Sequence, residues 1–207
     1  MFIVIDGPDG SGKTTLAKSL TQQLCREGVT AVYTSEPTRE SDAGEMIHKI
    51  LQSCEKTNIY TFADLFLADR KEHLANFIEP CLYANKCVVC DRYKYSALAY
   101  QQFQGIDPGY LIRKNNDFLI PDYIFILLPQ NVDVLIHRIV YRGQVTELFE
   151  KKETLTAIIP YYCKMKDYFP GENIQYLNAE NSTEDNLSQI LGTIDTGNRP
   201  KEHRILT

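Results

Sequence analysis

The stretch Gly7-Pro8-Asp9-Gly10-Ser11-Gly12-Lys13-Thr14-Thr15 decides how this chain folds. It fits the pattern G-x-x-x-x-G-K-[ST] at every fixed position, and it closely follows the continuous apolar run Phe2-Ile3-Val4-Ile5. Such a run is typical of a parallel strand that is buried on both faces. The sequence therefore predicts a strand, a glycine-rich turn and a helix that begins inside the motif.

This turn predicts a phosphate-binding site. Gly7, Gly10 and Gly12 allow backbone conformations that a side chain forbids, so that successive N–H groups can point at one anion near the helix N-terminus. Lys13 would reach the outer phosphates of a nucleotide, and the Thr14 hydroxyl would bind Mg²⁺. The alternative interpretation is a glycine-rich turn that binds no ligand.

Length and charge limit the function classes. The chain has 207 residues, which suits one α/β domain over residues 1–194 followed by a polar tail over 195–207. The net charge of −5 disfavours nucleic acid or an anionic membrane as a partner, because such partners need a clustered basic surface. No secretory signal precedes the first strand, and the most apolar segment, 123–128, is too short to span a bilayer. We therefore expect a cytoplasmic protein.

The six cysteines are scattered along the chain. Cys87 and Cys90 lie in one apolar run that reads as a strand, where their odd spacing points the two thiols to opposite faces. This arrangement favours reduced core thiols over a zinc or redox site.

Apolar runs alternate with amphipathic segments along the chain. This alternation predicts a P-loop α/β fold of three layers, with a five-stranded parallel sheet, helices on both faces and a ligand site at the carboxyl ends of the strands. The predicted strands are 2–5, 30–34, 87–90, 123–128 and 174–177. The predicted helices are 13–26, 44–54, 62–83, one after residue 93, 132–142, 155–168 and 183–191.

Two further patterns suggest that a phosphoryl group is transferred. Asp91 ends a buried strand, where an acid can hold Mg²⁺ or its water, and Arg92 directly follows it, placed to bind phosphates. On the long helix, Phe66 and Arg70 fall one turn apart, so that a ring and a guanidinium could stack on a base and hydrogen-bond its carbonyl. The alternatives are a strand-end ion pair between Asp91 and Arg92 and core packing of Phe66.

Taken together, these stretches resemble the thymidylate kinase family. The motif at 7–15 is followed, in the family's order and at its separations, by Leu65–His73, by Asp91–Gln101, which reads D-R-Y-x-Y-S-x-L-A-Y-Q, and by Pro121-Asp122. Arg138–Gly143 resembles the lid, which would span about 138–150, and Asn178-Ala179-Glu180 would lie near the nucleotide base. The resemblance implies in-line transfer of the γ-phosphoryl group of ATP to dTMP, with Mg²⁺, by a homodimer.

The resemblance also implies roles for single residues. Phe66 would stack on thymine, Arg70 would read its carbonyl oxygen, and Tyr100 would crowd the 2′ position of the sugar. The implied catalytic residues are Lys13, Asp9, Arg92 and Arg142. The implied ATP-binding residues are Gly7, Pro8, Asp9, Gly10, Ser11, Gly12, Lys13, Thr14, Thr15 and Arg138. The implied substrate-binding residues are Asp9, Arg39, His48, Phe66, Arg70, Arg92, Ser96, Ala97 and Tyr100, and the implied metal-binding residues are Thr14 and, through water, Asp91.

The source of the catalytic cation divides this family. Members with glycine in the P-loop supply an arginine from the lid, and Gly10 places this chain among them. Arg142, with Arg138, would then stabilise the charge that spreads over the transferring oxygens. The alternative is a solvated basic helix face.

Four positions depart from the family pattern. Ser35 and His48 stand where arginine is usual, Ala97 stands where a polar residue often contacts the pyrimidine, and Ile159 replaces an arginine. Arg39 is close enough in sequence to compensate for His48. Two alternatives therefore stay open: a kinase for another pyrimidine deoxynucleotide, such as dUMP or a modified dUMP, and a nucleotide-binding protein with weak turnover.

Overall fold

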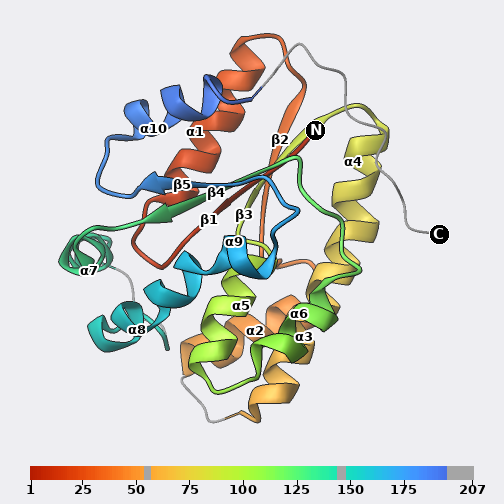
Figure 1. Cartoon of the computed structure of the whole chain (residues 1–207). Helices are drawn as coiled ribbons and strands as arrows, with labels where there is room; N and C mark the ends of the chain where they lie inside the picture. The colour runs from red at the N-terminus through yellow and green to blue at the C-terminus, as the bar shows by residue number, and fades with distance from the viewer. Residues whose placement is uncertain (54–56, 144–147, 195–207) are drawn as a thin grey trace.

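A parallel sheet of five strands forms the centre of the molecule (Figure 1). The computed structural model describes residues 1–53, 57–143 and 148–194, so the predicted tail over 195–207 lies outside the described residues. The strands are β1 (Phe2–Asp6), β2 (Ala31–Ser35), β3 (Cys87–Asp91), β4 (Tyr123–Leu128) and β5 (Ile174–Asn178). They lie in the order β2-β3-β1-β4-β5, with every neighbouring pair parallel.

The centre of this sheet is buried on both faces. Every residue of β1 and β3 is buried, which explains why both strands read as continuous apolar runs. Ile5 of β1 pairs with Asp91 of β3 on one side and with Phe125 of β4 on the other. Because parallel strands end at the same edge, the turns that follow β1 and β3 emerge side by side.

Helices cover both faces, as predicted for this fold class. On one face, α1 (Lys13–Arg26) and α10 (Thr183–Leu191) pack on Ile3 and Ile5 of β1. On the other face, Phe2 and Val4 of β1 share a core with residues of most of the other helices. These are α3 (Ile59–His73), the π-helical turn η1 (Leu74–Ile78), α4 (Glu79–Tyr83), α5 (Lys94–Phe103), α6 (Pro108–Asn115), α7 (Val132–Tyr141), α8 (Lys152–Cys163) and α9 (Met165–Tyr168). Helix α2 (Asp42–Ser53) packs against α3.

Three helices differ from the sequence prediction. The helix predicted over 62–83 begins earlier, at Ile59, because the Asn58 side chain accepts hydrogen bonds from the next turn, and it passes through η1. The helix predicted over 155–168 is divided into α8 and α9. Helix α6 was not predicted, although Asp107 caps it and Pro108 occupies its first turn.

The cysteines follow the strand geometry. Cys87 packs in the core beside α1 and Cys90 in the core on the opposite face, which confirms that the two thiols point away from each other. Both are free, and burial raises the pKa of Cys87 to about 12. Among the described helices, none is both long enough and apolar enough to cross a membrane.

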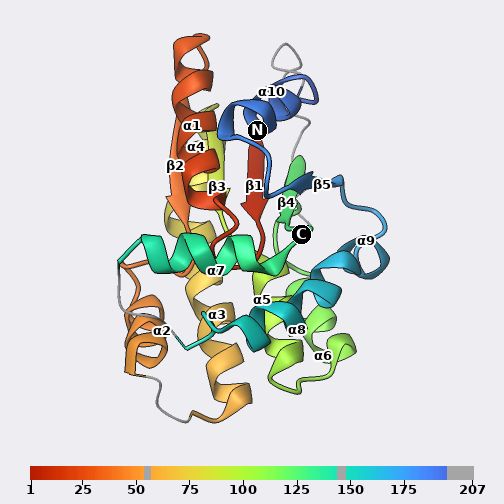
Figure 2. The same cartoon turned by 90° about the vertical axis from the view of Figure 1, so that its left-hand side faces the viewer.

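Helix α7 takes a separate position from the other helices. Figure 2 shows it running across the molecule where the strands end. Its residue Arg138 donates hydrogen bonds to the carbonyl oxygens of Ala179, beyond β5, at 2.8 Å and of Ser11, after β1, at 3.3 Å. The helix therefore lies directly on the edge where a ligand site is expected.

Candidate active site

The turn between β1 and α1 brings α7 into close contact with the start of the chain. Gly10 has a φ of +78°, and a Cβ atom at this position would lie 2.5 Å from the carbonyl oxygen of Leu135 in α7. Only glycine suits both the backbone conformation and the space. The absence of a side chain at residue 10 therefore allows α7 to place its arginines at the phosphate-binding turn.

Lys13 lies inside this turn. Its ammonium group donates to the Pro8 carbonyl oxygen at 3.2 Å and lies 3.5 Å from a carboxylate oxygen of Asp9. Burial, together with the nearby charge of Arg92, lowers the pKa of Lys13. A phosphate at the turn would provide the negative charge that favours the ammonium form.

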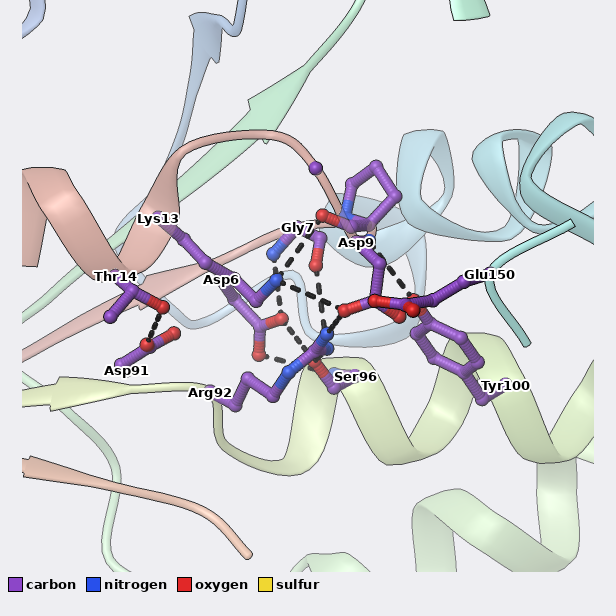
Figure 3. Close-up of polar contacts among 12 residues, drawn as sticks. Asp6, Gly7, Asp9, Lys13, Thr14, Asp91, Arg92, Ser96, Tyr100 and Glu150 are labelled. Atoms are coloured by element: carbon purple, nitrogen blue, oxygen red, sulfur yellow. Dashed lines mark hydrogen bonds and ion pairs between the residues drawn. The ribbon is translucent and has the colours of Figure 1, made fainter. Parts of the chain in front are cut away.

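Asp9, Arg92 and Tyr100 form a connected cluster next to Lys13 (Figure 3). One oxygen of Asp9 pairs with the Arg92 guanidinium, and the other accepts a hydrogen bond from the Tyr100 hydroxyl at 2.7 Å. Burial acts to raise the pKa of Asp9, but the charges of Arg92 and Lys13 outweigh it and hold that pKa below its usual range. Asp9 is thus a fixed anion, and Arg92 is held with its guanidinium facing the turn.

Asp6 is a part of the site that the sequence analysis missed. It is fully buried at the end of β1, and its carboxylate accepts the backbone N–H groups of Gly7 at 2.7 Å, Tyr93 at 3.0 Å and Ser96 at 3.1 Å. The N-cap residue of α5, Tyr93, makes no side-chain cap of its own, so Asp6 caps α5 from a different strand. In the sequence, the position of Asp6 directly after the apolar run 2–5 could have indicated that it belongs to the site.

Ser96 belongs to the same network. Its hydroxyl donates to Asp6 and accepts a hydrogen bond from Arg92 at 2.8 Å. Burial outweighs the nearby charge of Arg92 and raises the pKa of Asp6. Asp6 and Ser96 therefore link the end of β1, the turn after β3 and the start of α5.

Thr14 and Asp91 suit a magnesium ion. The Thr14 hydroxyl donates to one carboxylate oxygen of Asp91 at 2.5 Å, and the Tyr33 hydroxyl approaches the same oxygen at 3.4 Å. The other oxygen of Asp91 is buried and has no hydrogen-bond partner among the described residues. Mg²⁺ prefers oxygen ligands and keeps several waters, so a hydroxyl beside a carboxylate with a spare oxygen fits it.

Two clefts meet at this cluster. The first, of about 460 Å³, is lined by the turn at 9–16, by Arg138 and by residues after β5 such as Asn181. The second, of about 1120 Å³, lies between the residues after β2 and helices α3 and α5. The residues that line both clefts are Asp9, Thr14, Thr15, Arg92 and Arg142.

The second cleft contains the residues that the resemblance assigns to the acceptor. Phe66 is half-buried and meets the edge of the Phe62 ring, with ring centroids 5.1 Å apart. His48 lies with a ring nitrogen 3.3 Å from the Pro37 carbonyl oxygen, and Arg39 is exposed at the cleft. The residues assigned to the acceptor all line this cleft: Asp9, Arg39, His48, Phe66, Arg70, Arg92, Ser96, Ala97 and Tyr100.

Three of the four departures from the family pattern lie at the same cleft. Ser35 lines it beside the end of β2, and His48 and Ala97 line it from α2 and α5. Gln101, one turn after Ala97 and not selected from the sequence, is buried there with its side-chain nitrogen unpartnered among the described residues. Ile159 is half-buried in α8 and lines neither cleft.

Arg70 is held from two sides. Its Nε donates to Glu36 at 2.9 Å, and its Nη1 donates to the side-chain oxygen of Asn115 at 2.8 Å. Glu36 is held in turn by His73, whose Nδ1 lies 3.3 Å from the second carboxylate oxygen. The side chains of Arg70 and Glu36 are only 1% and 3% exposed, so a buried carboxylate compensates the buried guanidinium. Neither Glu36 nor Asn115 was predicted, because both come from segments remote in sequence from Arg70.

Arg142 lies where α7 ends, at the junction of the two clefts. Its guanidinium is 2.5 Å from a carboxylate oxygen of Glu150, whose side chain is 1% exposed and extends towards Asp9 and Arg92 (Figure 3). Residues 144–147 of the predicted lid lie outside the described residues.

Comparison with known proteins identifies the family. A sequence model of the thymidylate kinase family matches residues 5–190. A probable thymidylate kinase of Pyrococcus horikoshii is 39% identical over 198 residues, which cover 93% of this chain and 95% of the relative. A thymidylate kinase of Brachyspira hyodysenteriae is 32% identical over 206 residues, which cover 99% of this chain and 95% of the relative. The chain therefore belongs to the thymidylate kinase family, a family of nucleoside monophosphate kinases.

Proposed function

We propose that this protein transfers the γ-phosphoryl group of ATP to the phosphate of dTMP, which yields ADP and dTDP. One observation supports this proposal above the others: the first and second clefts share a wall made of Asp9, Thr14, Thr15, Arg92 and Arg142. Two nucleotides that enter from opposite sides would bring their phosphates together at that wall. The reaction needs little more from a protein than such positioning and electrostatic stabilisation.

The first cleft would bind ATP. Backbone N–H groups of the turn and the Lys13 ammonium would bind its phosphates, and Arg138 lies beside the region where the base would lie. Thr14 and, through water, Asp91 would hold Mg²⁺, which when bound neutralises charge on the phosphate oxygens.

The second cleft would bind dTMP. Phe66 offers a ring face for thymine, and Arg70 and the Gln101 amide offer hydrogen bonds to the base. Tyr100, fixed by Asp9 at 2.7 Å, would lie against the sugar and exclude a 2′-hydroxyl. Arg92 would bind the acceptor phosphate.

The chemical step follows from this arrangement. An oxygen of the acceptor phosphate attacks the γ-phosphorus, and the bond from that phosphorus to the β–γ bridging oxygen breaks, so that the bridging oxygen leaves with ADP. Negative charge spreads over the equatorial oxygens during transfer. Arg142, at the junction of the clefts, would leave Glu150 to stabilise that charge.

A coupled assay of ADP release with dTMP, dUMP, UMP and dGMP tests the proposal, with Lys13→Ala as the inactive control. We expect the highest kcat/KM with dTMP. Equal or higher kcat/KM with dUMP would favour the second candidate, a kinase for dUMP or a modified dUMP, which the small Ala97 side chain in the second cleft favours. Binding of ATP without turnover of any acceptor would favour a nucleotide-binding protein.

We also propose that the protein is a cytoplasmic homodimer. Helices α2, α3 and η1 carry large apolar side chains that are exposed, at 52% for Met46, 47% for Tyr60 and 38% for Phe77. The five cysteines that the structure describes are free thiols, which suits a reducing compartment. Sedimentation velocity should give twice the 23.7 kDa mass of one chain, whereas a purely monomeric protein at micromolar concentration would contradict the dimer.

A further inference from the structure

We infer that Asn115 is a positioning residue that fixes the Arg70 guanidinium and thereby sets which pyrimidine the second cleft accepts. This inference rests on the proposed function, because it concerns the base of the acceptor nucleotide. Asn115 is fully buried at the end of α6, a helix that contributes no residue to either cleft. Of the two residues that its side chain hydrogen-bonds, Arg70 and Leu111, Arg70 lines the second cleft.

Glu36 alone holds only one edge of the guanidinium. Both Nε and Nη2 of Arg70 approach the same carboxylate oxygen, at 2.9 and 2.8 Å. A planar group that is bound to a single atom can still pivot about that atom. The contact from Nη1 to the Asn115 oxygen, at 2.8 Å, adds a second fixed point from a different helix.

The surroundings of Asn115 determine which way its amide faces. The amide nitrogen donates to the carbonyl oxygen of Leu111, one turn earlier, at 2.8 Å. A carbonyl oxygen only accepts hydrogen bonds, and a guanidinium only donates them. The two neighbours are therefore compatible with one amide orientation, in which the oxygen faces Arg70.

Two aromatic rings also lie against the guanidinium. The central carbon of the Arg70 guanidinium lies 5.0 Å from the centroid of Tyr93 and 5.5 Å from that of Phe118. Contact with these rings restrains the guanidinium further. Asn115 and Glu36 restrain it at its polar edges, so that its remaining N–H groups have a fixed direction.

A fixed and compensated guanidinium discriminates between bases. Because Glu36 already compensates its charge, Arg70 suits a neutral acceptor better than a phosphate. Uracil and thymine present a carbonyl oxygen at ring position 4, whereas cytosine presents an amino group that also donates. The Gln101 amide can turn to offer either a donor or an acceptor, so discrimination depends on Arg70.

The test compares dUMP with dCMP, which differ at ring position 4 and in the proton at position 3. We would measure kcat and KM for dTMP, dUMP and dCMP with Asn115→Leu, which has a similar size and no acceptor. A slow substrate can be measured as a competitive inhibitor of dTMP phosphorylation. Asn116→Leu is the matched control, since Asn116 is exposed at the end of the same helix.

For Asn115→Leu we expect the KM for dTMP to rise by about tenfold, with kcat changed by less than about threefold. The preference for dUMP over dCMP should fall by about tenfold. An unchanged preference in Asn115→Leu would overturn the inference, even if the melting temperature fell. If that variant does not fold, the same comparison on Asn115→Ala decides. Failure of the wild-type protein to phosphorylate any pyrimidine nucleotide would instead contradict the proposed function.

Discussion

At the scale of single residues, Arg142 gives the sharpest kinetic prediction. It lines both clefts, and its side chain is 40% exposed while its partner Glu150 is 1% exposed, so the melting temperature of a variant must be compared beside its kinetics. We expect Arg142→Ala to lower kcat by about 10³, as removal of an arginine finger does, with a much smaller change in KM. Steady-state kinetics with Arg113→Ala, an exposed arginine of α6, as control would check this. If kcat fell by less than tenfold, a cation other than Arg142 would have to stabilise the charge of the transition state.

Asp9 gives a prediction for pH. Arg92 and Lys13 outweigh the effect of burial and hold the folded-state pKa of Asp9 below 3.8, the value for an unperturbed carboxyl. A depressed folded-state pKa contributes stability above pH 3.8, and that stability is lost as the pH falls from 3.8 towards the folded-state value. The difference in the free energy of unfolding between the wild type and Asp9→Asn should therefore be constant near neutral pH and shrink in acid. Urea titrations at several pH values would measure it, and an undiminished difference in acid would contradict the assignment.

Local patterns in the sequence were enough to predict which residues meet at the phosphate-binding turn. Asp91 ends one strand and Arg92 follows it, and Lys13 and Thr14 begin the helix after another strand, so the order of elements was enough to predict that they meet at one edge of the sheet. The partners that orient them were not predictable. Asp6 caps a helix whose N-cap residue, Tyr93, lies 87 residues later, and Asn115 meets Arg70 from 45 residues away, so only the folded chain reveals them.

At the scale of elements, α5 depends on a buried ion pair. Lys94, at its first turn, lies 2.5 Å from Glu172 in the loop before β5, and the two side chains are 1% and 6% exposed. The Tyr95 hydroxyl donates to the other oxygen of Glu172. Because α5 carries Ala97 and Tyr100 into the second cleft, this pair anchors one wall of the site.

Breaking one side of this pair should be costly. Glu172→Gln leaves the Lys94 ammonium buried without a counter-charge and should lower the free energy of unfolding by about 3 kcal/mol. The double variant Lys94→Met with Glu172→Gln should regain a large part of that loss, because it removes the buried charge as well. Chemical denaturation of the wild type, Lys94→Met, Glu172→Gln and the double variant would measure the coupling free energy between the two residues. Additive losses would show that the pair is not coupled.

Most helices and strands were predictable because the spacing of apolar residues in the sequence matches the side chains that the fold buries. The central strands β1, β3 and β4 are mostly apolar runs, and each of the five strands was found to within one or two residues. Helix α6 was missed because it has eight residues and only Leu111 and Asn115 are buried, too few to show an apolar stripe. The division of the long helix by η1 leaves no trace in hydrophobic spacing, since a π-turn changes the register of one turn only.

At the scale of the whole molecule, the shared wall predicts how a linked ligand should bind. Adenosine and thymidine joined through five phosphates would occupy both clefts at once. Such a compound should bind about 10² to 10⁴ times more tightly than ATP or dTMP alone, because the second contact becomes intramolecular. Calorimetry on the wild type would measure this gain, with a two-phosphate linker as the control that is too short. Equal affinity for both linkers would mean that the clefts do not bind the two nucleotides end to end.

The contact between Gly10 and α7 also limits how this enzyme can evolve. A side chain at position 10 would collide with the Leu135 carbonyl, so an arginine introduced there must displace the helix that carries Arg138 and Arg142. An arginine at position 10 and the present positions of Arg138 and Arg142 would then exclude each other within one molecule. A lineage that moves from one to the other must pass through intermediates that hold neither cation correctly, unless compensating changes in α7 come first.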